Sequence, residues 1–325
     1  MGKLNVITNS MASCFQSCRK KYQYRYVDNI VPVDDNVTAL SFGSAVHSAL
    51  ERWFKYNIKE DAILVARSFP GLDTENQIKA AVLIEKYIEH WCNDEDLFRV
   101  VGIEKEFSVP LTNPDTNSKS RTWKLCGKAD GLLRVNGKLY IMEHKTTSCL
   151  DDTYIARIQI DKQIALYADA LSRELKEPVC GAIYDIIQKP TIRMKKGETE
   201  EEFQARRAAL IAKSKTGTSS AKRQEPETEE AFEQRVRDSI DETFFRRERI
   251  EFTRANIQSH MREMWQISKD IKQGVYYRNT NECNAIGRKC PYLELCICGG
   301  DISLCEGLYT NERAHIELST DILDE

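Results

Sequence analysis

The chain of 325 residues contains no long apolar run. No apolar segment reaches the roughly 18 residues that a membrane-spanning helix needs, and no basic-then-apolar leader opens the sequence. We therefore expect no membrane span and a cytoplasmic location. A strong net charge is also missing, since 47 Lys and Arg against 50 Asp and Glu give −3 at pH 7. This excludes an overall basic coat for nucleic acid but leaves room for a local basic channel.

Cysteine is plentiful, but its number, 11, is odd. In a reducing compartment such thiols serve as metal ligands, redox groups or buried residues rather than as a disulfide framework. Cys283, Cys290 and Cys296 lie in a C-terminal segment without periodicity, at the spacing C-x6-C-x5-C. Such a segment needs something to fold around, so zinc or an iron–sulfur cluster is expected. The C-x2-C pair of zinc ribbons is absent, and Cys18 is our candidate for a distant fourth ligand.

A β-hairpin is the clearest local structure that the sequence predicts, in residues 123–148. Its turn is Asn136-Gly137, because both central residues of a type I′ turn need positive φ angles. A two-residue loop also fixes the register, so that Val135 pairs with Lys138. Every earlier residue then pairs with a later one such that the two residue numbers sum to 273. The hairpin therefore predicts which side chains face one another.

Charged side chains gather on one face of this hairpin. The register places Asp130 opposite Glu143, and strand alternation puts Lys128 and Lys145 on the same face. Two facing carboxylates repel, whereas a divalent cation between them would make the pair favourable. We therefore expect a metal site, against the alternative of a solvated face of an antiparallel sheet. A β-bulge near Gly131 would move the two acids apart.

Two predicted helices carry polar side chains that this site could use. In the helix of residues 41–56, His47 lies beside the apolar stripe. In the helix of residues 153–175, Gln163 and Tyr167 are one turn apart on the same side. Each has an ordinary structural alternative, because a lone helical histidine and a partly buried polar pair are common in proteins without any catalytic role.

Residues 8–30 predict a helix that is dense in Cys, Lys, Arg and Tyr. Cys14 and Cys18 are one turn apart on one face of it. Its basic and aromatic side chains fit contact with phosphates and bases, and they fit equally well an amphipathic helix whose aromatic residues turn inward.

Residues 190–240 are highly charged and poor in apolar side chains. They contain a short internal repeat, ETEEEFQAR from Glu198 and ETEEAFEQR from Glu227. Each copy begins a helix with a threonine cap and an acidic first turn. We expect two solvated helices joined by a flexible loop, whose basic residues fit a solvated surface better than a nucleic-acid contact.

Six segments taken together resemble a known family. In chain order they read CFQSCRKKYQYRYV, FGSAVHSALE, GKADGLL, MEHKTTS, QIALYADAL and CPYLELC. Their sequence and order are similar to those of RecB-type nucleases of the PD-(D/E)XK superfamily. The resemblance is closest to the iron–sulfur branch, which includes CRISPR-associated exonucleases, AddB nuclease domains and phage relatives, and it spans most of the chain.

The resemblance implies catalytic roles for three hairpin residues. Asp130 matches the acidic residue of the family's G-x-x-D motif, and Glu143 and Lys145 match its E-x-K motif. His47 matches the helix histidine that completes the metal shell in this branch. With Asp130 and Glu143 it would hold Mg²⁺ or Mn²⁺.

Further matches concern the DNA strand and the cysteines. Gln163 and Tyr167 match the Q-x-x-x-Y motif, which in relatives helps to place the DNA strand. The resemblance also implies a four-iron four-sulfur cluster that ties the two ends of the domain together, with the ligands Cys18, Cys283, Cys290 and Cys296. Relatives commonly carry C-x2-C before the final x5-C, so Cys283 is the least secure of these ligands. The possible substitutes are Cys14, Cys298 and Cys305.

The implied reaction is metal-dependent hydrolysis of phosphodiester bonds in DNA. We expect an exonuclease of recombination, repair or replication, and the resemblance to phage members makes a phage its candidate source. Lys145 would orient or deprotonate the attacking water, or neutralise the charge that develops on phosphorus. Lys128, opposite Lys145 by register, is a candidate phosphate contact. The alternatives are a non-catalytic iron–sulfur or zinc protein that binds DNA, and a zinc-stabilised regulatory protein.

The expected fold is mixed α/β, with a restriction-endonuclease-like core in which helices flank a mixed β-sheet and a C-terminal cysteine loop closes onto the N-terminal helix. We expect one nuclease domain over residues 1–310. Its parts are a core at 36–189, a charged helical insertion at 190–240 and a cluster-binding segment at 276–305, before a tail at 311–325. The partner is DNA, as single strands or duplex ends, and any helicase or recombination partner would be another chain because helicase motifs are lacking.

Overall fold

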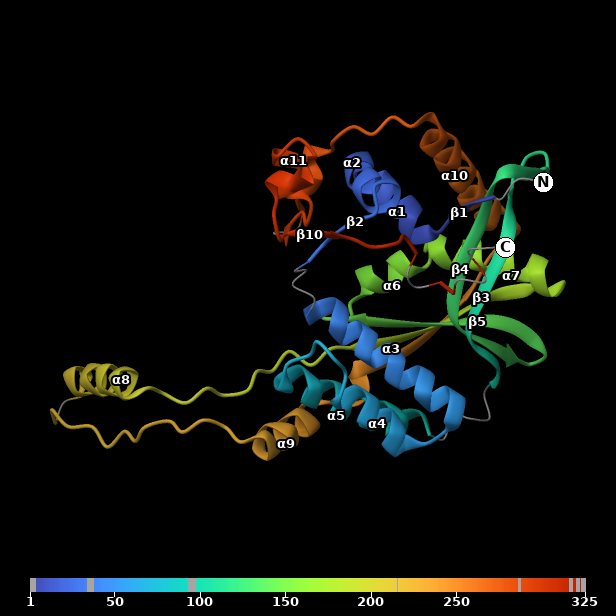
Figure 1. The fold of residues 1–325 in the computed structure, drawn as a ribbon. Helices are drawn as coiled ribbons and strands as arrows, with labels where there is room; N and C mark the ends of the chain where they lie inside the picture. The colour runs from blue at the N-terminus through green and yellow to red at the C-terminus, as the bar shows by residue number, and fades with distance from the viewer. Residues whose placement is uncertain are drawn as a thin grey trace.

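The predicted hairpin lies at the centre of a six-stranded mixed sheet (Figure 1). The computed structural model describes residues 4–33, 38–92, 98–214, 216–285, 288–315, 318–319 and 322. The strands of the sheet are β1 (Asn5–Ile7), β3 (Arg99–Thr112), β4 (Lys119–Val135), β5 (Lys138–Thr147), β6 (Val179–Gln188) and β7 (Phe245–Glu251). Their order is β1-β4-β5-β6-β7, with β3 also paired to β4. The pairs β1–β4 and β5–β6 are parallel and the others antiparallel, which confirms the predicted mixed sheet.

The hairpin has the predicted turn and register. Asn136 and Gly137 have φ angles of 49° and 79°, as a type I′ turn requires. The antiparallel ladder runs in the predicted step from the turn as far as Met142. Beyond it, the backbone N–H of His144 donates to Oδ2 of Asp130 at 2.8 Å. The first acid of the predicted site is therefore held by a side-chain hydrogen bond where the regular ladder ends.

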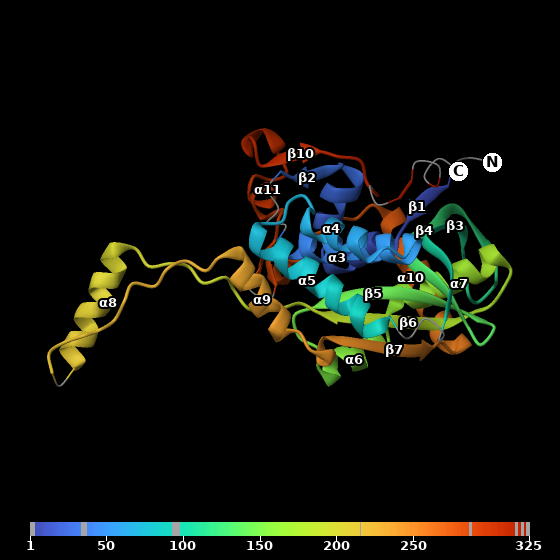
Figure 2. The same cartoon turned by 90° about the horizontal axis from the view of Figure 1, so that it is seen from below.

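Helices cover both faces of the sheet (Figures 1 and 2). One face packs against α3 (Thr38–Tyr56), α4 (Lys59–Arg67), α5 (Thr74–Trp91) and α9 (Glu229–Ser239). The other packs against α1 (Asn9–Ser17), α7 (Lys162–Leu175) and α10 (Arg254–Gln273). None of the helices in the described ranges has the length and apolar character of a membrane span.

Shorter elements complete the fold. The remaining helices are α2 (Arg19–Tyr22), a π-helix at Gln23–Val27, α6 (Asp152–Ile158), α8 (Glu200–Lys213) and α11 (Leu293–Ile297). Single 3₁₀ turns lie at Glu242–Phe244, Thr280–Cys283 and Ile302–Leu304. Two small antiparallel pairs are formed by β2 (Ile30–Pro32) with β10 (Tyr309–Asn311) and by β8 (Asn284–Ala285) with β9 (Arg288–Lys289).

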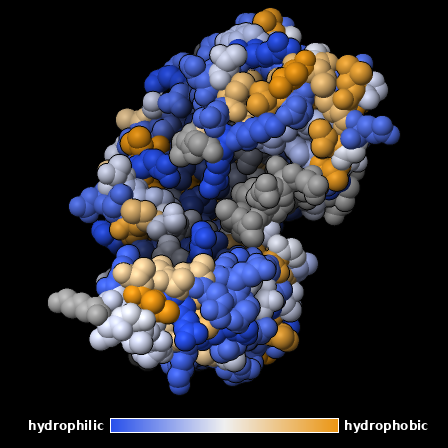
Figure 3. Space-filling model, turned by 90° about the vertical axis from the view of Figure 1, so that its left-hand side faces the viewer, coloured by the Kyte–Doolittle hydropathy of each residue, from blue (hydrophilic) through white to orange (hydrophobic). Residues whose placement is uncertain are grey.

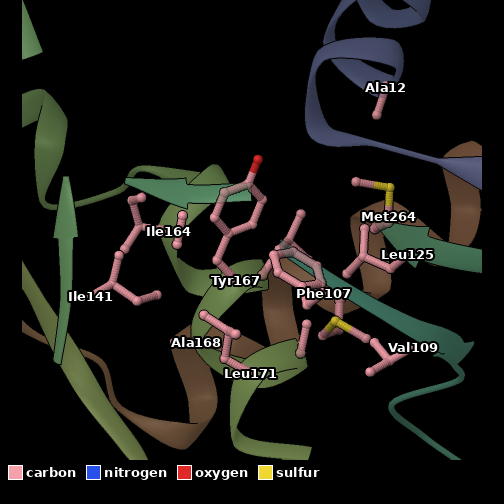
Figure 4. Packing of buried hydrophobic residues seen from close by; sticks show 14 of the residues in the cluster. Ala12, Phe107, Val109, Leu125, Ile141, Ile164, Tyr167, Ala168, Leu171 and Met264 are labelled. Carbon is pink, nitrogen blue, oxygen red and sulfur yellow. The ribbon is translucent and has the colours of Figure 1, made fainter. Parts of the chain in front are cut away.

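The core beneath α7 fixes this helix against the hairpin. Figure 4 shows Phe107 and Val109 of β3 beside Leu125 of β4, with Leu171 of α7 and Met264 of α10 packed around them. Burying each such apolar side chain contributes about 1.5–3 kcal/mol relative to leaving it in water. The N-terminal end of α7 is thereby held close to the strand ends that carry the predicted site.

Two predicted helices are interrupted. The helix expected over residues 8–30 breaks at Cys18, whose φ and ψ of −156° and 113° are extended. The helix expected over 153–175 breaks between α6 and α7, where Asp161 caps α7 by accepting from the backbone N–H of Gln163 at 2.9 Å. Each break turns the chain locally and so changes the direction in which the following side chains point.

The charged insertion forms an arm that projects from the body, with α8 at its tip (Figures 1 and 2). As expected of a solvated helix, α8 has no buried residue among those described. The expectation is wrong for α9, because Phe232 and Val236 are fully buried against α5. These two residues are one turn apart, which turns one side of α9 into part of the core.

The two copies of the internal repeat make the same contacts within the arm. Glu198 pairs with Arg206, and Glu227 pairs with Arg235 at 2.6 Å, in each case across eight residues. Each carboxylate also accepts a backbone N–H from the opposite segment of the arm, at 3.0 and 2.8 Å. The donors, in the same order, are Gln224 and Lys195. The repeat in the sequence is therefore a repeated tertiary contact.

Seen from the side to which the arm projects, the molecule is hollowed between an upper and a lower mass (Figure 3). Comparison with Figure 1 places α1, α2 and α11 in the upper mass, and α3 to α5 with the arm in the lower one. The strand ends that carry the predicted site lie between these two groups of helices (Figure 1).

Candidate functional site

Asp130, Glu143 and His47 lie near one another at the end of the β4–β5 hairpin. The two acids come from neighbouring strands, and His47 comes from α3, which crosses the strand ends. Nδ1 of His47 is 3.5 Å from Oδ2 of Asp130, and Glu143 is only 3% exposed. The helix approaches closely because of Gly43, where a Cβ would lie 3.2 Å from Oγ1 of Thr146.

The two carboxyl groups have opposite electrostatic environments. Burial alone would raise the pKa of Asp130, but the hydrogen bond and charge of His47, with the backbone N–H of His144, lower it to about 2. Burial, together with the neighbouring charge of Asp130, raises the pKa of Glu143 to about 7, although Lys145 opposes this. Glu143 is therefore the carboxylate that gains more from a nearby cation.

Lys145 and Gln163 hold one oxygen of Glu143. Nζ of Lys145 is 2.6 Å from Oε1 of Glu143, and Nε2 of Gln163 donates to the same oxygen at 3.2 Å. Burial lowers the pKa of Lys145, but the charge and hydrogen bond of Glu143 outweigh it, so that the pKa is raised. This direction is opposite to the one that a lysine acting as general base requires.

The other oxygen of Glu143 is the candidate ligand for a metal ion. Oε2 is buried and has no hydrogen-bond partner among the described residues. Within the same residues, no three His, Cys, Asp or Glu side chains are arranged as a ready-made metal site. The donor set nevertheless fits Mg²⁺ or Mn²⁺, because hard cations prefer carboxylate oxygens and Asp130 supplies a second one nearby. A nitrogen ligand such as His47 suits Mn²⁺ better than Mg²⁺.

Lys128 lies beyond the described β4–β5 ladder. The ladder ends before the expected pair of Lys128 with Lys145, and on the other side of β4 Lys128 pairs with Glu106 of β3. Its Nζ forms an ion pair with Glu104, and this pairing raises the pKa of Lys128 although burial alone would lower it. The convergence of the two amines on one face stays a prediction. A phosphate contact by Lys128 stays a prediction, and it requires exchange of Glu104 for the phosphate.

Tyr167 is part of the core rather than of the group around Glu143. It is 7% exposed, and its ring packs edge-on against Phe107 at a centroid distance of 4.9 Å. A Cβ added to Gly127 would lie only 2.8 Å from this ring, so the ring packs closely against the backbone of β4. Figure 4 shows its hydroxyl directed out of the cluster. Of the predicted Gln163–Tyr167 pair, Gln163 contacts Glu143, and the DNA contact of both residues stays a prediction.

A second buried acid, which the sequence analysis did not single out, lies next to the site on β6. Asp185 faces His144 of β5 in the ladder, and its Oδ2 is 3.1 Å from Nδ1 of that histidine. The hydroxyl of Tyr87 donates to it, and Nε of Arg247 lies 3.3 Å from Oδ1. The available signal was an acid inside the apolar strand VCGAIYDIIQ, where a buried charge must have partners.

The four cysteines expected to bind a cluster line one small cavity of about 30 Å³. They are Cys18, Cys283, Cys290 and Cys296. Cys18 lies at the break between α1 and α2, and the backbone N–H of Asn279 points to its Sγ at 3.4 Å. Thiolates are the ligands that zinc and iron–sulfur clusters use, although among the described residues these four do not form a ready-made metal site. The possible substitutes are outside this lining; they are Cys14, Cys298 and Cys305.

Comparison with models of protein families gives a match over most of the chain. A model of the PD-(D/E)XK nuclease superfamily matches residues 7–297. The chain belongs to the PD-(D/E)XK nuclease superfamily. Members of this superfamily are mostly metal-dependent nucleases, which agrees with a carboxylate pair beside a lysine at the end of a hairpin. The match extends from β1 to the cysteine-rich segment and so includes the hairpin, α3 and α7.

Solved structures and curated proteins add little to this assignment. One similar solved structure, described as the crystal structure of SSO0001, is 13% identical, with a TM-score of 0.26. The match covers 58% of this chain and 65% of that chain, less than two thirds of it. Likeness at this level carries no argument about function. Comparison with curated proteins finds no match.

Proposed function

We propose that this PD-(D/E)XK protein is a metal-dependent DNA nuclease of the RecB-type iron–sulfur branch. The observation that carries the proposal is Glu143, a buried carboxylate with one oxygen bound by Lys145 and Gln163. The other oxygen has no hydrogen-bond partner among the described residues. A buried carboxylate oxygen without a donor is costly, and a bound cation removes that cost.

In this proposal Asp130, Glu143 and His47 hold Mg²⁺ or Mn²⁺. The cation, when bound, makes its water more acidic and offsets negative charge on the phosphate. His47 and the backbone N–H of His144 both contact Oδ2 of Asp130, so they fix the direction in which this carboxylate points. The protein therefore prepares the carboxylates before substrate arrives.

Lys145 positions the attacking water and neutralises negative charge that develops on the phosphate. Its Nζ donates to Oε1 of Glu143 at 2.6 Å, which holds the amine beside the carboxylate that would bind the cation. Oε1 of Gln163 accepts a hydrogen bond from Nζ of Lys145 at 3.4 Å and so limits where the amine can move. We therefore favour the orienting role over the general-base role.

We further propose that the cysteine cavity holds a four-iron four-sulfur cluster with a structural role. Its ligands would be Cys18 with Cys283, Cys290 and Cys296, so that the cluster fastens α1 and α2 to the C-terminal segment. The part of the chain at 1–310 then acts as one nuclease domain. Support comes from the shared lining of the cavity and from the order of the motifs.

Exonuclease action on single strands or duplex ends is the mode that the motif order favours, in recombination, repair or replication. If duplex must be opened, a helicase or recombination partner supplies that activity. End-labelled DNA distinguishes the modes, because an exonuclease releases short products from one end from the start, whereas an endonuclease first gives internal fragments.

The test is cleavage of labelled single- and double-stranded DNA with Mn²⁺, Mg²⁺ or EDTA. We expect products with a metal and none with EDTA. Glu143→Ala and Lys145→Ala should each cut at least about 100-fold more slowly, while Glu60→Gln, an exposed acid in the first turn of α4, should cut normally. Intact DNA with wild-type protein would instead favour the non-catalytic DNA-binding alternative, and equal cleavage by all variants would contradict the site.

A further inference from the structure

A second hollow, lined by aromatic rings, lies beside the candidate active site. Its volume is about 200 Å³, smaller than the roughly 300–1,000 Å³ of pockets for drug-sized ligands, which suits one small planar group. It opens between α3, α5, β3 and β7. The lining used below, among the described residues, is Trp53, Phe54, Tyr87, Trp91, Phe98 and Arg247.

The hollow is connected to the acids through one histidine. The ring of Phe54 stacks on the ring of His144 at a centroid distance of 5.5 Å and an angle of 22°. The backbone N–H of the same His144 donates to Asp130. On α3, Phe54 lies two turns beyond His47, which corresponds to about 10 Å at roughly 1.5 Å per residue. The rings of His47 and His144 are 5.9 Å apart, so the aromatic hollow and the histidine that contacts Asp130 are joined through His144 over a span of a few nucleotides.

The walls combine flat apolar surface with a fixed cation. The guanidinium carbon of Arg247 is 3.8 Å from the ring centroid of Trp91 and 5.1 Å from that of Phe98. Asp185 and Tyr87 hold Arg247 in this position from the other side. Trp91 and Phe98 are partly exposed and line the hollow.

We propose that this pocket receives one unstacked base of the substrate strand, an inference that rests on the proposed nuclease function. Aromatic rings stack on any base because every base has a π-face, and arginine adds a cation–π contribution. At about 3.4 Å per nucleotide in a stacked strand, about 10 Å places this base about three nucleotides from the scissile phosphate.

The pocket also defines the substrate class. A base inside a duplex is paired and stacked, so it enters a pocket only after it has been extruded. A single strand or a frayed end avoids that cost. The preferred substrate is therefore DNA whose bases are already unpaired near the cleaved bond, and the selection is insensitive to base identity.

The test is an abasic scan. Single-stranded oligonucleotides carry one abasic residue at successive positions from the cleaved bond, and KM and kcat are measured for each. In wild-type protein we expect KM to rise about tenfold at one position, with kcat little changed. Trp53→Ala should raise KM for the intact oligonucleotide and lose this dependence on position. Trp53→Phe keeps a ring and should retain a weaker dependence.

Tyr56→Ala is the matched control, since Tyr56 lies on the same helix, is 47% exposed and is outside the lining of the pocket. It should show the wild-type profile. A flat scan in wild-type protein, or a Trp53→Ala profile that keeps the same sensitive position, would overturn the proposal. Melting curves show whether Trp53→Ala folds. If it does not, the scan with Trp53→Phe tests the proposal, which requires a weaker dependence of KM on position than in the wild type.

The scan separates failure of the pocket from failure of the proposed nuclease function. The same oligonucleotides are titrated against Glu143→Ala, and binding is followed by quenching of tryptophan fluorescence. Position-dependent binding without any cleavage by wild-type protein would contradict the nuclease function and retain the pocket. Cleavage with position-independent KM and binding would contradict the pocket and retain the nuclease function.

Discussion

Asp185 shows at the residue scale how a buried charge is maintained next to the candidate active site. It is fully buried and is bonded to His144, Tyr87 and Arg247. A buried ion pair contributes little net stability compared with apolar residues of similar volume, but removal of one partner leaves the other charge buried and uncompensated. The contribution of these contacts is therefore seen in the stability that is lost when one partner is removed.

We predict that Asp185→Asn lowers the free energy of unfolding by about 3–5 kcal/mol, because Arg247 keeps its charge and loses its counter-ion. Urea unfolding at pH 7 measures this. The control is Asp115→Asn, which breaks an ion pair with Arg262 in which both side chains are more than half exposed, and which should cost less than about 1 kcal/mol. Equal losses in the two variants would contradict the account.

The pH dependence of this difference has a definite sign. Burial alone would raise the pKa of Asp185, but the charge of Arg247 and the hydrogen bonds of His144 and Tyr87 lower it. A carboxyl whose pKa is lower in the folded state stabilises the fold above its unfolded pKa of about 3.9, and this contribution is lost as the pH falls further. The difference in the free energy of unfolding between wild type and Asp185→Asn should therefore narrow below about pH 4.

Some residues of the site could be predicted from local sequence and others could not. The Asn136-Gly137 turn fixes the register near Glu143 and places it close to Asp130, so a short stretch is sufficient. Arg247 belongs to a strand that follows Asp185 by more than fifty positions, and nothing local indicates that the two will meet. The register stops being informative beyond the end of the ladder, so the pairing of Lys128 with Lys145 stays a prediction.

At the scale of elements, the arm shows one repeat used for two purposes. In both copies a glutamate before the threonine cap pairs with an arginine and accepts a backbone N–H from the opposite segment. The helices that follow differ, because α8 buries nothing among its described residues while α9 buries Phe232 and Val236. The same contact therefore supports an exposed helix at the tip and a core helix at the base.

This difference predicts different outcomes for the same substitution. Glu198→Gln should loosen only the tip, so that limited trypsin digestion of the arm becomes several-fold faster while the thermal midpoint of the body is unchanged. Glu227→Gln should lower the thermal midpoint as well, since α9 is anchored in the core through Phe232. Each variant is the control for the other, and identical effects on the midpoint would contradict this assignment.

The caps of these two helices could be predicted, but the packing of α9 could not. A threonine cap with an acidic first turn is a local signal, and both Thr199 and Thr228 accept the expected backbone N–H. Two apolar residues in a charged helix are too weak a signal to indicate burial. The break at Cys18 was missed for a related reason, because helix-forming residues lie on both sides and the extended residue is fixed by tertiary contacts.

At the scale of the whole molecule, the two ends of the chain are brought together. β2 near the N-terminus pairs with β10 near the C-terminus, and Tyr292 donates its hydroxyl to the carbonyl of Ile30. The cavity that Cys18 shares with the C-terminal cysteines lies in the same region. Tyr24 and Ile30 also share a small apolar core with Tyr292. A cluster in this cavity would add to the contacts that join these two segments.

We predict that Cys290→Ser and Cys296→Ser lose iron and visible colour and have lower thermal midpoints, because each removes a cluster ligand. Elemental analysis and absorbance spectra measure the metal. Cys92→Ser, at an exposed thiol outside the cavity lining, is the control and should keep both iron and stability. Unchanged iron in the first two variants would contradict the assignment, and zinc without iron in the wild type would replace the cluster by a zinc site.

The fold class could be predicted from the resemblance of six ordered segments to a nuclease superfamily, while the pocket beside the site could not. The aromatic pocket combines Trp53, Trp91 and Arg247 from three elements with Phe98, which precedes β3, and no local pattern connects them. Such a feature depends on how the layers pack, so it becomes visible only in three dimensions.

The central claim is that Asp130 and Glu143 together hold a divalent cation, and titration of the protein with Mn²⁺ tests it most directly. Calorimetry should show binding to wild-type protein, with affinity at least about tenfold lower for Asp130→Asn and Glu143→Gln. Glu60→Gln should bind Mn²⁺ as the wild type does. Mn²⁺ affinity that is the same in all four proteins would contradict the account.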